Sequence, residues 1–385
     1  MSGGVKKSRL LKELVWSGFE FAPAQVFGGV RLVPLLRSDH RDDLRLSKTV
    51  FKPAASSVSL SNSNTYCSYI PHGLVASWNK EGGAVIGTQT MNMAAESELH
   101  PPVSRKPVSL KGMARRTASQ ELRFLPMHTA MEGYLSHHFG GPEIAWSEYR
   151  RETLKYGLGS RYEYTHSGRV ISGLEDALRV FEIHENQIGM ALFVSDSLAA
   201  VFVVPHPNDY TALHSTLLSD FYGEVIFYYG LFAKDTRLSV PSIDADRVGS
   251  FQALREEVDV VRRNWSAWHE SQTATLFNRP IEAVGLHKFH PFTLQRFSTG
   301  FDPSHDNHIG ECIVDESKTI QYLKTFRLSV KQCKRAYILS KLAEAEWNLD
   351  ACAALLDCSR LALIDRLKSA GFGYLLHQHI LDAKH

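Results

Sequence analysis

The sequence predicts an α+β fold, with a mainly antiparallel sheet core and packed helices, followed by an all-α C-terminal module. Three observations support this prediction. Two apolar runs, IGMALFV and LAAVFVV, are joined by three polar residues at 195–197, which is typical of a β-hairpin. Short β-like runs alternate with turn clusters over residues 58–90. Residues 336–367 have instead the apolar spacing of short helices.

Length and composition limit the class of protein. A chain of 385 residues suggests two or three domains, here placed at 1–240, 241–316 and 317–385. A net charge of +2 gives no overall attraction to polyanions, so any contact with nucleic acid must come from a local patch. There is no apolar run of membrane-spanning length, no signal-peptide core and no tight cysteine pairing. We therefore expect a cytoplasmic protein with no membrane partner.

The N-terminal part alternates short elements. Residues 1–20 have the pattern of a short amphipathic helix, and residues 28–37 read as a strand. Pro34 favours an edge position or a bulge in that strand, because proline cannot donate a ladder hydrogen bond. Residues 39–43 (DHRDD) form a charged turn, and residues 58–90 predict an antiparallel meander.

The central part is organised around the hairpin. The proline-containing and basic stretch 92–120 predicts an extended loop, whereas 124–139 and 143–155 predict helices. Asn208 or Asp209 is expected to cap the helix that follows the hairpin. Because both hairpin strands are apolar at nearly every residue, both of their faces must be covered.

The region after the core contains one long helix and a loop-rich segment. Residues 236–250 are rich in turn formers and suggest a boundary, and 251–276 predict a charged helix with one exposed face. The histidine-rich segment 280–312 is expected to be a loop-rich connection to the C-terminal helices.

The C-terminus has the spacing of a helix-turn-helix. Asn348 and Ser359 are the expected caps of two short helices, linked only by Asp357 and Cys358. This region resembles the Fis-type helix-turn-helix at the C-terminus of bacterial enhancer-binding regulators. The matching residues are Asn348, Ala353, Ala354, Leu356, Ser359, Arg360, Leu363 and Leu367.

The resemblance implies that the last helix enters the major groove of double-stranded DNA. The contacts would come from Ser359, Arg360, Arg366 and Lys368. The sequence departs from the family pattern at Ala362, Ile364 and Asp365, and a carboxylate repels phosphate. The alternative is a module for dimerisation or protein docking.

Four histidines form a possible metal site. His287, His290, His305 and His308 make two HxxH spacings, and neutral imidazoles can hold Zn²⁺. Structural zinc sites usually include cysteines, so we expect scattered surface histidines and no metal here.

A second set of residues could perform acid–base chemistry. His128 and Glu132 are four residues apart on one helix face. His184 and Glu185 lie where a helix meets the hairpin, and His206 and Asp209 lie where the chain leaves it. Histidine beside a carboxylate suits acid–base catalysis or a metal site. The alternative is that polar residues gather at helix ends to satisfy backbone groups. No Walker, dinucleotide-binding or nucleophile-elbow motif is present, so no cofactor is identified and catalysis is not the leading expectation.

The order of elements also carries a resemblance. FGGVRLVPLL, the hairpin and the helix NDYTALHSTLLSDFYGE make residues 20–232 similar to a divergent ARPP-type domain, named for association with ADP-ribosylglycohydrolases and rhodanese-phosphatases. The resemblance implies a prokaryotic conflict or NAD- and ADP-ribose-linked context. We therefore expect a regulatory or accessory protein that forms homo-oligomers or protein complexes. The alternatives are an enzyme acting on a nucleotide or ADP-ribose-like substrate and a non-catalytic scaffold of a defence complex.

Overall fold

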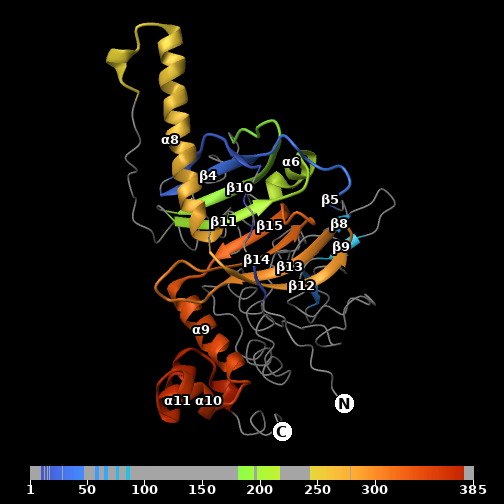
Figure 1. Ribbon diagram of the computed structural model, residues 1–385, viewed down its shortest axis with the longest axis vertical. Helices are drawn as coiled ribbons and strands as arrows, with labels where there is room; N and C mark the ends of the chain where they lie inside the picture. The colour runs from blue at the N-terminus through green and yellow to red at the C-terminus, as the bar shows by residue number, and fades with distance from the viewer. Residues whose placement is uncertain are drawn as a thin grey trace.

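A ten-stranded antiparallel sheet is the main element of the protein, as a computed structural model shows (Figure 1). The structure describes most of residues 10–46, four short strands between 57 and 86, residues 181–216 except 195–196, and residues 243–376 except 278. The strand order is β1-β12-β13-β14-β15-β11-β10-β4-β2, and β3 also pairs with β4. This architecture confirms the predicted fold class.

The strands of this sheet come from both ends of the chain. They are β1 (Leu10–Lys12), β2 (Glu20–Phe21), β3 (Gln25–Phe27), β4 (Val30–Leu36), β10 (Gln187–Val194), β11 (Ser197–Val203), β12 (Ile281–Phe289), β13 (Phe292–Thr299), β14 (His308–Val314) and β15 (Ile320–Arg327). Strand β15, the last strand in the chain, pairs with β11 of the hairpin. The hairpin is thereby joined to the unit of consecutive strands β12, β13, β14 and β15.

The predicted hairpin is confirmed as β10 and β11. Every residue of β10 is buried, because both faces of the sheet are covered. The strands also approach closely at Gly189, where a Cβ atom would lie 2.2 Å from the carbonyl oxygen of Phe202. Glycine is therefore required at that position by its neighbour strand.

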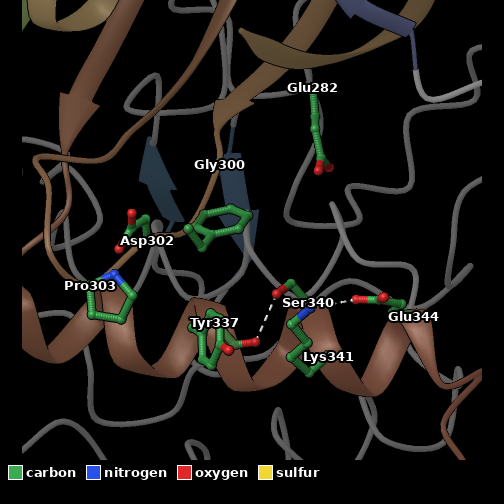
Figure 2. A pocket seen from close by; sticks show the side chains of 9 residues that line it. Glu282, Gly300, Asp302, Pro303, Tyr337, Ser340, Lys341 and Glu344 are labelled. Carbon is green, nitrogen blue, oxygen red and sulfur yellow. Dashed lines mark hydrogen bonds and ion pairs between the residues drawn. The ribbon is translucent and has the colours of Figure 1, made fainter. Parts of the chain in front are cut away.

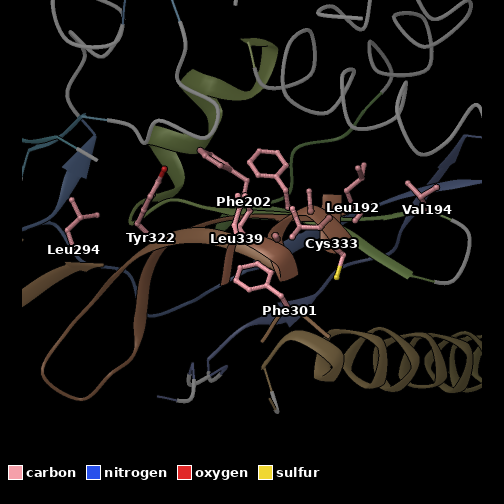
Figure 3. Close-up of a cluster of buried hydrophobic side chains, with 14 of the residues drawn as sticks. Leu192, Val194, Phe202, Leu294, Phe301, Tyr322, Cys333 and Leu339 are labelled. Atoms are coloured by element: carbon pink, nitrogen blue, oxygen red, sulfur yellow. The ribbon is translucent and has the colours of Figure 1, made fainter. Parts of the chain in front are cut away.

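The two faces of the sheet carry separate apolar clusters, as the alternation of side chains along a strand requires. One cluster contains Met190, Leu192 and Phe202, and continues into the C-terminal helices through residues such as Cys333 and Leu339 (Figure 3). The other contains Ala191, Phe193, Val201, Val203 and Leu323, with Leu276 from the long helix.

The described helices are α6 (Pro207–Thr216), α8 (Phe251–Phe277), α9 (Val330–Glu344), α10 (Leu349–Leu355) and α11 (Arg360–Ser369), with single 3-10 turns at Ala245–Arg247 and Gly373–Leu376. No helix in this part of the chain is long and apolar enough to cross a membrane. Figure 1 shows α9, α10 and α11 gathered as a small module below the sheet.

The charged helix predicted after residue 250 is confirmed as α8. Its first half, 251–264, contains no buried residue and projects beyond the sheet (Figure 1). Its second half packs on the sheet through His269, Thr273 and Leu276, which recur at helical spacing and are at most 1% exposed.

The prediction for the N-terminus is wrong where the structure describes it. Residues 10–12 form strand β1, which pairs with β12, so a sheet edge decides their conformation rather than helical periodicity. Strand β4 is not an edge strand either. Its outer side pairs with β3 at 30–32 and with β2 at 35–36, and Pro34 lies between these two partners. The missing N–H of Pro34 is therefore tolerated inside the sheet.

The stretch 58–90 forms two small antiparallel sheets instead of one meander. One sheet has the order β5-β8-β9 and the other pairs β6 with β7. Their bounds are Arg45–Leu46 (β5), Ser57–Ser59 (β6), Thr65–Cys67 (β7), Val75–Ser77 (β8) and Ala84–Ile86 (β9). The predicted loop at 92–120 and the helices at 124–139 and 143–155 lie outside the described residues.

The expectation of a loop-rich segment at 280–312 is wrong. This segment contains β12, β13 and the start of β14, whose histidines and prolines fall at the turns or alternate with apolar residues along the strands. The sheet thus takes strands from all three predicted domain ranges. The domain boundaries themselves stay a prediction.

The C-terminal caps agree with the sequence. The side chain of Asn348 accepts hydrogen bonds from the N–H groups of Asp350 and Ala351, and the hydroxyl of Ser359 accepts one from Ala362. Asp357 has a φ of 47° in the connection between α10 and α11.

Candidate functional site

One end of the sheet brings together polar residues that are distant in the sequence. Strands β4 and β11 both pair antiparallel with β10 between them, so their C-terminal ends lie beside the start of β10. His40 and Asp42 follow β4, and His206 follows β11. The predicted pair His184 and Glu185 immediately precedes β10 at this same end.

His40, Asp42 and His206 form a group of three possible metal ligands in the part of the chain that the structure describes. One donor atom from each residue lies within 4.8 Å of the other two. The Nε2 atom of His206 is 3.3 Å from Oδ1 of Asp42, and the two imidazole rings meet edge to face at 4.6 Å between centroids. His206 is buried, whereas the side chain of Asp42 is 81% exposed.

Helix α6 fixes the orientation of the His206 ring. The carbonyl oxygen of His206 accepts hydrogen bonds from the N–H groups of Asp209 and Tyr210, and its Nδ1 atom accepts one from Asn208 at 3.1 Å. His206 is therefore the cap of this helix, whereas the sequence predicted Asn208 or Asp209, and Pro207 occupies the first helical position. Because Nδ1 is an acceptor, the ring proton is on Nε2, which faces Asp42.

The neighbouring carboxylate has a different partner. The Nε atom of Arg41 donates to Oδ1 of Asp43 at 2.7 Å, and this hydrogen bond lowers the pKa of the Asp43 carboxyl. The Arg41 guanidinium also lies 4.8 Å from the centroid of the Phe292 ring. Two adjacent aspartates thus have different partners, Asp43 the Arg41 guanidinium and Asp42 the His206 ring.

The predicted catalytic residues are only partly described. The backbone N–H of His184 donates to the side chain of Gln187, and the N–H of Arg37 donates to the carbonyl of Asn186 at 3.1 Å. These bonds tie the loop before β10 to the end of β4. His128 and Glu132 lie outside the described residues.

The four histidines considered as a possible metal site are not brought together. His290 is exposed in the turn before β13 and lies 3.0 Å from Glu316, whereas His305 follows β13 and lies 2.8 Å from Asp302. Strand β13, which lies between these two positions in the chain, has eight residues and is about 27 Å long. His287 is part of β12, in register with Leu294.

The fourth member of that set, His308, is fully buried in β14. Burial lowers its pKa to about 3, and the charges of Arg327 and Arg279 act in the same direction. A neutral histidine inside the sheet is a structural residue.

A buried charged pair lies in the middle of the sheet. Glu311 of β14 is in register with Lys324 of β15, and both side chains are fully buried. Burial lowers the pKa of Lys324 to about 7, although the Glu311 charge opposes this shift. Perturbed pKa values of this kind occur in structural networks as well as in active sites.

A cavity of about 610 Å³ opens at the opposite end of the sheet, against α9 (Figure 2). Its charged lining consists of Glu282, Asp302, Glu344 and Lys341, and Lys341 is already paired with Glu344 at 2.8 Å. The carboxylates outnumber the cations. This cavity is therefore unsuited to a phosphate-containing ligand such as a nucleotide. The full lining is Glu282, Gly300, Phe301, Asp302, Pro303, Tyr337, Ser340, Lys341 and Glu344.

The predicted DNA-contacting residues all lie on α11 or at its cap and are exposed. Nη1 of Arg360 makes an ion pair with Asp350 of α10 at 3.0 Å. Arg366 and Lys368 lie in the last turn of α11. In the first turn of the same helix, Leu361 is 74% exposed.

Sequence reasoning missed His40 and Asp42 because it treated DHRDD as a charged turn only. Histidine and aspartate two residues apart directly after a buried strand could have marked them. His206 was a candidate beside Asp209, but its partners His40 and Asp42 could not have been assigned, since the order of β4, β10 and β11 decides which loops meet.

Comparisons with known proteins identify the family. No curated protein and no solved structure matches the chain. Nothing found supports a Fis-type helix-turn-helix, and DNA binding has no support from these comparisons. The ARPP-2 family model matches residues 14–289, which is more than two thirds of the chain and extends beyond both ends of the resemblance noted in the sequence. The chain therefore belongs to the ARPP-2 family.

Proposed function

We propose that this protein is an accessory component of a prokaryotic ADP-ribose-linked or defence-type system, and that its C-terminal module assembles it with a second copy of the chain. Membership of the ARPP-2 family supports the ADP-ribose-linked or defence-type context. The assembly role rests mainly on one observation, the 74% exposure of Leu361 in the first turn of α11.

In a helix-turn-helix, the start of the second helix is the part that contacts base edges. A leucine there, with Leu355 47% exposed at the end of α10, presents an apolar surface instead of hydrogen-bonding groups. Arg360, the nearest cation, is held by Asp350, and Asp365 adds a negative charge to the exposed residues of α11. These features favour a protein partner over DNA.

The test measures the molar mass of the full chain by light scattering and compares Leu361→Ser with the wild type. We expect a wild-type dimer and a variant shifted to monomer, because burial of an exposed leucine drives association. Ala351→Ser, at an exposed position of α10, is the matched control and should remain a dimer. A monomeric wild type, or a dimeric Leu361→Ser variant, would contradict the assembly role.

The DNA alternative is tested in parallel by fluorescence anisotropy of a labelled duplex at two salt concentrations. The variant is Arg360→Ala/Arg366→Ala/Lys368→Ala. Salt-sensitive binding that this variant loses would make the module a DNA-binding unit, since phosphate contacts release counterions. We expect no such binding.

A further inference from the structure

We propose that His40, Asp42 and His206 form a binding site for a divalent transition-metal cation. The ligands would be two imidazole nitrogens and one carboxylate oxygen. This inference does not depend on the proposed assembly role, since the site and the C-terminal module share no residues.

The spacing of the donor atoms fits such a site. Zn–N and Zn–O bonds of 2.0–2.2 Å at tetrahedral angles place ligand atoms about 3.3 to 3.5 Å apart. Nε2 of His206 and Oδ1 of Asp42 are already 3.3 Å apart. The His40 donor lies within 4.8 Å of both, so a bound cation would draw this side chain closer to the other two.

A second observation comes from His40 itself. Its Nδ1 atom is buried and has no hydrogen-bond partner among the described residues. A buried polar nitrogen without a partner costs free energy unless something binds it. Its ring lies edge to face against His206, and one of its ring nitrogens is the third member of the group of donor atoms.

The surroundings of His206 direct one ring nitrogen at Asp42. The backbone N–H of Asn208 contacts Nδ1 and leaves Nε2 facing Asp42. For Nε2 to bind a cation as a neutral imidazole, the ring proton moves from Nε2 to Nδ1, and Nδ1–H then donates to an acceptor in place of the hydrogen bond from Asn208. A metal-bound histidine that donates its other ring N–H is the usual arrangement in metal sites.

The ligand set also indicates the kind of cation. Two neutral imidazoles and one carboxylate suit Zn²⁺, Fe²⁺, Co²⁺ or Ni²⁺, whereas Mg²⁺ and Ca²⁺ prefer oxygen ligands only. Three protein ligands leave at least one position open. Since Asp42 is 81% exposed, water or a substrate could reach that position from solvent.

The experiment titrates the metal-stripped full chain with Zn²⁺ by calorimetry and with Co²⁺ by visible absorption. We expect binding of one equivalent and a Co²⁺ spectrum of low-symmetry, nitrogen-containing coordination. Asp42→Asn and His40→Ala should each weaken Zn²⁺ binding at least about tenfold. Asp42→Asn changes an exposed side chain, so its fold should be retained, and circular dichroism checks this.

The matched control is His290→Ala, which removes an exposed histidine that also lies beside a carboxylate, at 3.0 Å from Glu316. It should bind Zn²⁺ like the wild type. The proposal is overturned if the wild type binds no Zn²⁺, or if either Asp42→Asn or His40→Ala binds it as tightly as the wild type. Failure here leaves the molar-mass test of the proposed function unaffected.

Discussion

At the scale of single residues, the protein buries several titratable groups and surrounds one of them almost entirely with aromatic rings. His269 of α8 stacks on Trp265 at 5.4 Å between centroids and contacts Trp268, Phe193 and Phe21. It is 1% exposed, and neither ring nitrogen has a hydrogen-bond partner within the described part of the chain. Burial lowers its pKa to about 4, and the nearby charge of Arg31 acts in the same direction.

This environment predicts that His269→Phe reduces the acid sensitivity of the fold. The folded-state pKa of about 4 lies below the unfolded value of 6.5, so the unfolded state binds the proton first and stability falls as pH drops from 6.5 towards 4. At pH 5 the loss from this residue is about 2 kcal/mol relative to pH 7.5. Urea unfolding of the wild type and of His269→Phe at pH 7.5 and pH 5 measures the free energy of unfolding that each protein loses between the two pH values.

The measurement at pH 7.5 is the control for this substitution, since it reports whether phenylalanine fits the aromatic environment. His214 and His308 are also buried with lowered pKa values, so the variant should keep part of the acid sensitivity. An unchanged difference between the two pH values would contradict the prediction.

The sequence showed residue types but not these environments. The pattern of α8 predicted a helix with one exposed face, which holds for its second half, whereas no residue of 251–264 is buried. The pairing of Glu311 with Lys324 could not have been predicted, because each is a single charged residue in an apolar strand and only the strand register places them together. The same is true of His40 and His206, whose loops meet because β10 lies between β4 and β11.

At the scale of elements, close contact between strands determines where glycine is required. At Gly189 of β10 a Cβ atom would lie 2.2 Å from the carbonyl oxygen of Phe202, and at Gly310 of β14 it would lie 2.4 Å from that of Lys324. Both contacts are to backbone, which cannot move without disturbing the ladder. At Gly285 of β12, in contrast, a Cβ atom would meet nothing within 4 Å.

These glycines give a matched pair of substitutions. Gly189→Ala should lower the free energy of unfolding by about 1 to 3 kcal/mol, because overpacking forces neighbouring strands apart. Gly285→Ala should change it by less than about 0.5 kcal/mol, as is usual for an open position. Chemical denaturation of both variants measures this, and equal effects would show that strand contact is not the cause.

Element types were predictable where periodicity was strong, as in β10, β11, α8, α10 and α11. They were not predictable where a partner strand decides the conformation. Residues 10–12 form a strand because β12 pairs with them, and 281–299 form a hairpin although their histidines and proline suggested a loop.

At the scale of the whole molecule, the sheet extends beyond the family match. The match ends at residue 289, within β12, whereas β13, β14 and β15 lie between β12 and β11 in the sheet. Residues 14–289 alone therefore lack the three strands that join β12 to β11. The apolar cluster on one face also continues from the sheet into α9, α10 and α11.

Truncation should reveal this dependence. A chain ending at residue 316 loses β15, so β11 and β14 both lose a partner strand, and we expect it to be insoluble or unfolded. A chain ending at 329 keeps all ten strands and should retain the sheet, with lower stability because the apolar residues facing α9 become exposed. Soluble yield and circular dichroism distinguish the two. A folded chain ending at 316 would contradict the role given to β15.

The aromatic residues where the second half of α8 packs on the sheet allow the position of this helix to be followed in solution. Three of its six tryptophans, Trp16, Trp265 and Trp268, belong to one aromatic group around His269 and Phe21. Indole emission shifts and weakens when the ring passes from an apolar environment to water. Intrinsic fluorescence is therefore an optical reporter of whether the long helix is docked, and it needs no added label.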